Sequence, residues 1–228
     1  MDSFKRPLII DLSGKAGAGK TYVKDKLIQY LSPGYKCVDL SDYILTEKDF
    51  LDFVISRPVS FFLSILFVLL FIPKGYRWMC TCLRWWIKMQ IMIIKGKSLK
   101  CDFVFIDEGL FRRISLIRMY SFRRVLFENI PVLFRKHFLY PDITVFVMAN
   151  YDMCEKRRME RDRNTNRFKL PGNKRKGLII IDDLGKDIDY AEKTGIVKVL
   201  RYNNEREFEM SVLAELLRMK DGICRKYQ

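Results

Sequence analysis

One stretch constrains this chain more than any other: residues 8–23, which read LIIDLSGKAGAGKTYV. An apolar run ends at Ser13, the glycine-rich segment 14–19 follows, and a helical pattern begins at Lys20 and Thr21. The match to G-x-x-x-x-G-K-[ST] between a strand and a helix is typical of a phosphate-binding loop. Glycines let successive backbone N–H groups turn towards an anion, and the helix N-terminus adds positive potential. The stretch therefore predicts a site for the phosphates of a nucleoside triphosphate, with ATP favoured.

Within this loop the side chains have separate expected tasks. Lys20 is expected to reach the β- and γ-phosphates, and the Thr21 hydroxyl is expected to ligate Mg²⁺. A glycine turn without a ligand is the alternative interpretation. The predicted nucleotide-binding residues of the loop are Gly14, Lys15, Ala16, Gly17, Ala18, Gly19, Lys20 and Thr21.

The order of apolar runs indicates the fold class. Short runs predict strands at residues 8–12, 36–40, 102–107, 142–148 and 196–200, and helical patterns separate them. The first helix is expected at 20–31 and the last at about 205–219, with Asn204 as its N-cap. Strands that alternate with helices favour a parallel sheet in a single α/β domain, here covering residues 1–228.

A second set of acidic residues follows a predicted strand. The segment CDFVFIDEGLFRR ends its apolar run in Asp107 and Glu108. Ligands of such sheets bind outside the carboxyl ends of the strands, so Asp107 is expected beside the phosphate loop, where it would hold Mg²⁺ directly or through water. Glu108 would orient a nucleophile or accept its proton. The alternative is that both acids cap the next helix.

A strongly basic segment lies late in the chain. Residues 154–176 contain ten Lys and Arg against three acids, and Arg157 and Arg161 are four residues apart on one helix face. We interpret the segment as a basic lid that closes over phosphates and neutralises transition-state charge. Arg163 and Arg167 lie nearer its tip as substrate-binding candidates. A solvated basic face or a nucleic-acid patch is the alternative.

Together these features resemble the thymidylate kinase-like branch of P-loop nucleoside and nucleotide kinases. The residues that carry the resemblance are GKAGAGKT, the strand that ends at Asp107, and PDITVFV followed by an arginine helix with Lys156, Arg157 and Arg161. The resemblance implies a P-loop three-layer α/β/α fold with a five-stranded parallel sheet and a helical acceptor and lid region. It also implies ATP and Mg²⁺, and a base-binding loop at 201–204 that places Arg201 and Asn203 beside the adenine.

The chain departs from the family pattern where the acceptor would bind. The usual Asp-Arg-Tyr is here Asp-Glu-Gly at 107–109, so Arg112 or Arg113 would supply the missing arginine one turn later. The usual Glu-Pro-Gly-Gly is absent, which leaves Asp39 and Asp42 as the available acids. The acceptor is therefore expected to be a phosphate-bearing small molecule or a glycan- or lipid-linked compound, and it need not be a thymidine nucleotide.

An apolar insert occupies about 43–100 of the chain. Residues 59–72 carry no charge and are fewer than the ~20 that a spanning helix needs. We interpret them as a buried helix of the acceptor region. The alternative joins them to the Trp- and Lys-containing segment 78–94 as a hairpin at the inner face of the membrane. Residues 122–138 are expected to form a second helix of this region.

Composition limits the partners. Lys and Arg outnumber Asp and Glu by 42 to 27, a formal charge of +15, which indicates an anionic partner. The six cysteines lack zinc-site spacing, which favours reduced thiols in a cytoplasmic protein, with association with the inner membrane face as an alternative. Peripheral membrane contact and a homodimer are both open, and the chain contains no nucleic-acid-binding motif.

These observations favour an ATP-dependent phosphotransferase in which Lys20, Asp107, Glu108, Arg157 and Arg161 act in catalysis. The alternative is a P-loop ATPase or switch protein that works with a protein or membrane partner, with Glu108 activating water. A basic nucleic-acid-binding module is the third possibility. Turnover with and without an acceptor separates the first two.

Overall fold

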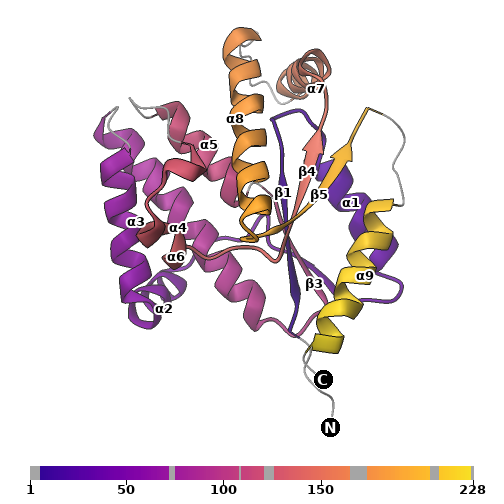
Figure 1. Ribbon diagram of the computed structural model, residues 1–228, viewed down its shortest axis with the longest axis horizontal. Coiled ribbons are helices and arrows are strands. Elements are labelled where there is room, and N and C mark those ends of the chain that lie inside the picture. Colours follow the sequence, from indigo (N-terminus) through magenta and orange to yellow (C-terminus); the bar gives the residue numbers. More distant parts are fainter. Residues whose placement is uncertain are drawn as a thin grey trace.

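A computed structural model describes residues 6–71, 75–107, 109–120, 126–164, 174–205 and 211–226. Its centre is a parallel sheet in the strand order β2-β3-β1-β4-β5 (Figure 1). The strands are β1 (Leu8–Ser13), β2 (Cys37–Asp39), β3 (Phe103–Asp107), β4 (Ile143–Met148) and β5 (Lys198–Asn203). The predicted five-stranded parallel sheet is confirmed.

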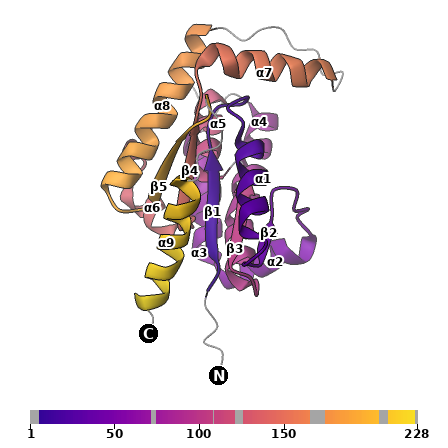
Figure 2. The same cartoon turned by 90° about the vertical axis from the view of Figure 1, so that its right-hand side faces the viewer.

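Helices cover both faces of the sheet, in the predicted three layers. On one face, α1 (Lys20–Leu31) and α9 (Ser211–Lys226) pack against the alternate β1 residues Leu8, Ile10 and Leu12 (Figures 1 and 2). On the other face, α4 (Tyr76–Ser98), α5 (Leu110–Tyr120) and α8 (Lys174–Lys193) form the larger core. Helix α7 (Tyr151–Asn164) lies beyond the carboxyl ends of the strands (Figure 2).

The last strand begins later than its apolar pattern predicts. Gly195, with φ 67° in the left-handed region, follows α8, and β5 runs over Lys198–Asn203 instead of 196–200. Only one residue of β5, Tyr202, is fully buried, because β5 is an edge strand that pairs with β4 alone. The partial exposure of an edge strand weakens the apolar signal by which its ends are predicted.

A helical lobe fills the insert between β2 and β3 and adds a later segment. It comprises α2 (Glu47–Ser56), α3 (Pro58–Phe71), α4 and α6 (Val132–His137), with a short 3₁₀ turn η1 at Phe127–Asn129. The single helix expected at 122–138 is wrong over its described part, because Pro131 takes an extended conformation between η1 and α6. Residues 174–176, the end of the predicted basic lid, belong to α8, and residues 165–173 of the lid lie outside the described residues.

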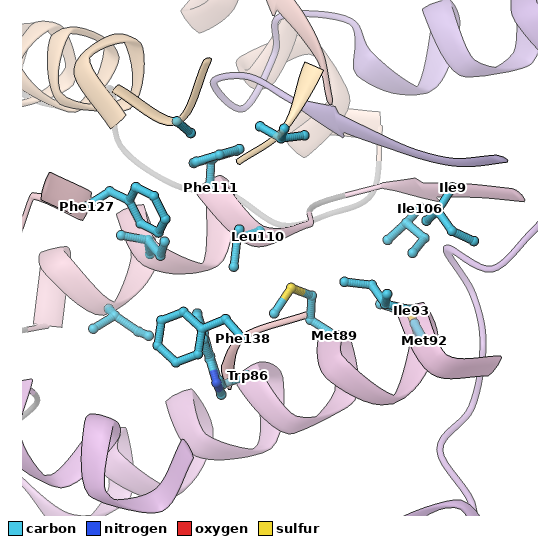
Figure 3. Close-up of a cluster of buried hydrophobic side chains, with 14 of the residues drawn as sticks. Ile9, Trp86, Met89, Met92, Ile93, Ile106, Leu110, Phe111, Phe127 and Phe138 are labelled. Atoms are coloured by element: carbon cyan, nitrogen blue, oxygen red, sulfur yellow. The ribbon is translucent and has the colours of Figure 1, made fainter. Parts of the chain in front are cut away.

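Helix α4 belongs to the protein core. Trp86, Met89 and Ile93 point from α4 towards the sheet and α5, and Phe138 closes over Trp86 (Figure 3). The indole Nε1 of Trp86 donates to Ser64 Oγ at 3.2 Å, which pairs the polar atom of a fully buried ring. The alternative that placed 78–94 at a membrane surface is therefore wrong for the buried part of α4, from Cys82 onwards.

A buried ion cluster joins α5 to α8. The guanidinium of Arg118 contacts the carboxylates of Asp187 and Asp183, and Asp187 also accepts from the Phe127 N–H at 2.7 Å. All three charged side chains are buried, and burial raises the pKa of Asp187 to about 6 against the opposing effect of Arg118. Removal of one charge from such a cluster leaves the others without compensation.

We predict that Arg118→Met lowers the free energy of unfolding by about 3 kcal/mol, because two buried carboxylates lose a cation that contacts them both. Urea unfolding measures the change. The matched control is Arg218→Met, which breaks the exposed pair with Glu215 and costs less than about 0.5 kcal/mol. Addition of Asp183→Asn and Asp187→Asn to Arg118→Met restores part of the loss; a further drop instead would contradict the charge argument.

Candidate functional site

The phosphate loop depends on glycine at two positions with left-handed backbone. Gly17 and Gly19 have φ values of 88° and 90°. A Cβ on Gly17 would lie 2.0 Å from the carbonyl oxygen of Cys154 in α7, and one on Gly19 would lie 2.0 Å from Asn204 Nδ2. The loop is closed by a hydrogen bond from Ala18 N to Lys15 O at 3.0 Å. Glycine is therefore required both by the backbone conformation and by the close neighbours.

Two side chains from distant segments hold the loop. Asn204, after β5, donates from Nδ2 to Ala18 O at 2.7 Å. Arg157 of α7 reaches the same carbonyl at 3.5 Å and also donates to Asn204 O at 3.2 Å. Asn204 is therefore not the N-cap of the last helix, which begins at Ser211 in the described chain.

The two lysines of the loop have different surroundings. Lys20 is buried, and its Nζ lies 3.5 Å from Lys15 O across the loop. Lys15 turns away, since its Nζ forms an ion pair with Glu155 at 3.0 Å and lies 3.4 Å from the ring centre of Tyr151. Lys20 is thus the lysine placed over the loop interior, as its position in the motif predicts.

Thr21 and Asp107 meet beside the loop. Thr21 Oγ1 donates to Asp107 Oδ2 at 3.1 Å, which joins the first turn of α1 to the end of β3. The other carboxylate oxygen, Asp107 Oδ1, is buried and has no hydrogen-bond partner in the described part of the protein. Buried oxygens are rarely left unpaired. A hydroxyl and an ionised carboxylate with a spare oxygen suit Mg²⁺, which takes oxygen ligands from one or two protein groups plus phosphates and water.

A second layer of contacts supports Asp107. Its backbone N–H donates to Ser41 Oγ at 3.1 Å, and Ser41 in turn donates from N and Oγ to Asp39. Lys24 of α1 pairs with Asp39 at 2.5 Å. Burial disfavours the charge of Asp39, but the Lys24 and Ser41 hydrogen bonds outweigh it and lower the pKa of Asp39. Asp39 therefore remains an ionised, paired carboxylate that orders the site.

Lys24 and Ser41 were not predicted as site residues from the sequence. Lys24 lies on the buried face of α1 between Val23 and Leu27, where a lysine is an anomaly in an otherwise apolar stripe. A lysine in that apolar stripe was the feature of the sequence from which Lys24 could have been predicted as a site residue. Ser41 had no such feature, because a serine after a short strand is ordinary turn chemistry.

A cavity of about 450 Å³ opens over the loop, and its lining is strongly cationic. Five of its lining side chains carry positive charge and one, Asp162, is acidic; Arg158 pairs with Asp162 at 3.1 Å and with Glu155 at 2.8 Å. Arg158 was not among the site residues predicted from the sequence. The described residues that line the cavity are Ala16, Gly17, Gly19, Lys20, Thr21, Arg112, Arg157, Arg158, Arg161 and Asp162.

Arg112 and Arg113 separate in space although they are neighbours in sequence. Arg112 lines the cavity, whereas the Arg113 guanidinium lies 5.5 Å from the ring centre of Trp85 on α4. Arg112 is therefore the arginine that occupies the position expected one turn after Asp107.

Other predicted residues do not reach the cavity. Arg163 is exposed near the end of α7, and Asp42 is exposed. Arg201 pairs with Asp189 and Glu192 of α8 at 2.6 and 2.7 Å, and Asn203 is exposed at the end of β5. Glu108 and Arg167 lie outside the described residues.

Asp11 is a buried acid that the sequence analysis did not single out. It lies in the middle of β1, accepts from Ser13 Oγ at 3.0 Å and from the Gly109 N–H at 2.9 Å, and is 1% exposed. Burial raises the pKa of Asp11 to about 7, against the opposing effect of these hydrogen bonds. Its signal was an Asp within an apolar run that is buried on both faces.

The comparisons with known proteins bear on the fold. No protein-family model and no curated protein matches the chain. The solved thymidylate kinase of Candida albicans aligns with a TM-score of 0.52 and 14% identity, over 96% of this chain and 94% of that chain. The fold is that of thymidylate kinase. The predicted P-loop kinase architecture is therefore confirmed, at an identity low enough to make this chain a divergent example.

Two further structures align over most of the chain. Thymidylate kinase from Ehrlichia chaffeensis has a TM-score of 0.46 and 15% identity, with 94% of this chain and 97% of that chain covered. Deoxyadenosine kinase from M. mycoides, with dCMP and dCDP bound, has a TM-score of 0.46 and 13% identity, with 94% and 99% covered.

We predict that Asp11 makes the protein less stable as the pH rises from about 4 to about 7. In that interval the unfolded chain has already released the proton that the folded chain retains, so the unfolded state binds fewer protons. Asp11→Asn removes this loss, and we expect it to be more stable than the natural protein by about 1–3 kcal/mol at about pH 8.

Urea unfolding at about pH 5 and about pH 8 measures the effect. The control is Asp25→Asn, a change on the exposed face of α1, which should leave the slope of stability against pH unaltered. An Asp11→Asn variant with the slope of the natural protein would contradict the assignment.

Proposed function

We propose that this protein is a kinase that transfers the γ-phosphoryl group of ATP to an anionic acceptor. The observation that carries the proposal is the cationic cavity over the phosphate loop, with Lys20, Arg112, Arg157 and Arg161 in its lining. A triphosphate supplies the negative charge that this lining attracts. The loop amides, at the N-terminus of α1, supply the donors that phosphate oxygens accept.

Mg²⁺ fits beside the triphosphate. Thr21 Oγ1 and Asp107 would hold the ion, directly or through water, and the unpaired Asp107 Oδ1 supports this assignment. When bound, Mg²⁺ would neutralise phosphate charge. Asp39, Ser41 and the backbone of Asp107 form the contacts that keep the carboxylate in place.

The chain contributes mainly position and charge to the transfer. Phosphoryl transfer develops charge on the equatorial, attacking and leaving oxygens, so preorganised cations lower the barrier. Arg157 is fixed by Ala18 O and Asn204 O, whereas Arg161 is largely exposed on the next turn of α7. We propose that Arg161 contacts the transferred phosphoryl group and that Arg157 holds the phosphate loop in place. Glu108 is retained as the candidate that orients the acceptor.

A second group of cations favours an anionic acceptor. Burial lowers the pKa of Lys88 on α4, and Arg113 and Arg84 lower it further, while Asp42 acts in the opposite direction. Three cations held together against one exposed acid suit an incoming phosphate or a similar anion. Nucleosides and nucleotides are candidates because the similar structures are a thymidylate kinase and a deoxyadenosine kinase, and sugar and lipid-linked phosphates remain candidates from the chemistry.

The test is ATP consumption by the purified protein with a panel of nucleosides, nucleotides, sugar phosphates and lipid-linked phosphates. Stimulation by one acceptor, with transfer of labelled γ-phosphate to it, supports the kinase. Saturable hydrolysis that no acceptor changes would instead support the ATPase or switch function and would overturn the proposal.

We predict that Lys20→Ala lowers turnover at least about 100-fold, because the variant loses the cation over the loop interior. The variant should keep the fold of the natural protein, which circular dichroism checks. Lys15→Ala is the control: its side chain faces Glu155 and Tyr151, so a much smaller loss is expected. Full activity of Lys20→Ala would exclude the mechanism.

We predict that Arg161→Ala lowers kcat about tenfold or more and changes the KM for ATP less than about threefold. An interaction made mainly in the transition state has this signature. Arg163→Ala is the matched control on the same helix, outside the cavity lining, and should stay within about twofold of the natural protein. Equal losses in the two variants would show that general basic charge, and not the cavity, governs the rate.

A further inference from the structure

Helix α3 is apolar on two opposite sides. One side, with Leu63, Phe67 and Val68, is buried against α4 and α6. The other side is exposed, although α3 contains no charged residue. A helix that is hydrophobic all round is normally covered on every side, by protein or by lipid.

Helix α2, which precedes α3 in the chain, also exposes apolar side chains, at Leu51 and Ile55. It ends at Ser56, and α3 begins two residues later at Pro58. Helix α3 lies at the outer edge of the helical lobe, away from the sheet (Figure 1). We call this surface the α3 face; its members, each more than half exposed, are Leu51, Ile55, Val59, Phe62, Leu69 and Leu70.

The lengths of α2 and α3 favour contact with the surface of a bilayer. Across the described residues, no single helix combines the length and apolarity of a membrane span, and α2 and α3 meet that test only together, across a bend of 105°. Neither helix alone has the length and composition of a span, so contact with the bilayer surface is the form of membrane contact that these helices suit.

The chain around α3 is basic, although α2 before it carries Glu47, Asp49 and Asp52. Between Asp52 and Asp102 the chain contains no Asp or Glu and eight Lys or Arg. Arg57 and Arg77, both exposed, flank α3, and the exposed aromatic residues Tyr76 and Trp78 lie beside Arg77. Basic residues and aromatic rings at the border of an apolar surface are typical of contact with anionic lipid headgroups.

The same charge distribution disfavours a second copy as the occupant. A two-fold dimer would place the α3 face of one protomer against the same face of its partner. That arrangement would bring the two acid-free basic segments together, with like charges opposed. An anionic lipid surface offers apolar depth for the side chains and negative charge for the border.

We propose that the α3 face docks the protein on a bilayer that contains anionic phospholipid, with α3 lying in the interface. Phe62 and Leu69 enter the apolar region, and Arg57 and Arg77 contact phosphate groups of the lipid. The inference is independent of the phosphotransfer proposed above, because none of these side chains lines the cavity over the phosphate loop.

Flotation with phosphatidylcholine vesicles, with and without about 30% phosphatidylglycerol, tests the proposal. The natural protein should float with the anionic vesicles, and about 0.5 M salt should reduce the bound fraction. Phe62→Asp combined with Leu69→Asp should lower the partition coefficient at least about tenfold. Ile179→Asp, which replaces an exposed apolar residue of α8, is the matched control and should bind as the natural protein does.

A second measurement does not rely on the charged variants folding. Phe62→Trp keeps an apolar ring at the site, and its fluorescence should be quenched by lipids brominated in the acyl chain, whereas Ile179→Trp should gain no such quenching. Equal flotation of the natural protein and the double Asp variant, or an absence of flotation, would overturn the proposal. A concentration-dependent dimer that Phe62→Asp dissociates, without vesicle binding, would assign the α3 face to a second copy instead.

Discussion

The packing of the phosphate-loop glycines against α7 and the segment after β5 determines how the rest of the site is arranged. Gly17 leaves room for the Cys154 carbonyl, and Gly19 leaves room for the Asn204 side chain. These close approaches let Arg157 and Asn204 share the carbonyl of Ala18. The phosphate loop, α7 and the segment after β5 are therefore held together by direct contacts. A substitution that displaces the loop would also displace the cations that face the phosphates.

A buried acid accounts for the glycine that follows Asp107 and Glu108 in this chain. A Cβ at position 109 would lie 2.1 Å from Asp11 Oδ1, and the Gly109 N–H donates to that oxygen. Glycine at 109 is thus the partner of Asp11, and the pair occupies space near the start of α5. Arg112, one turn along α5, supplies positive charge to the cavity instead.

The helical lobe separates two kinds of surface on neighbouring elements. The inner side of α4 forms the core with Trp86 and Met89, and the Trp85–Arg113 contact joins α4 to α5. The outer side of α3 is apolar and bordered by positive charge. The proposed acceptor site and the proposed docking surface would therefore both draw cations from the acid-free segment 53–101.

The sequence alone determined the parallel sheet, the span of α1 and the phosphate loop, because buried strands and the loop motif depend on local patterns. It also placed Asp107 beside Thr21, since the carboxyl ends of parallel strands meet at one edge. Only the tertiary structure distinguished Arg112 from Arg113, paired Asp39 with Lys24 and brought Asn204 to Ala18. These contacts join residues far apart in the chain or depend on which way a helix face turns. Local periodicity carries no information about such contacts, because packing between elements decides them.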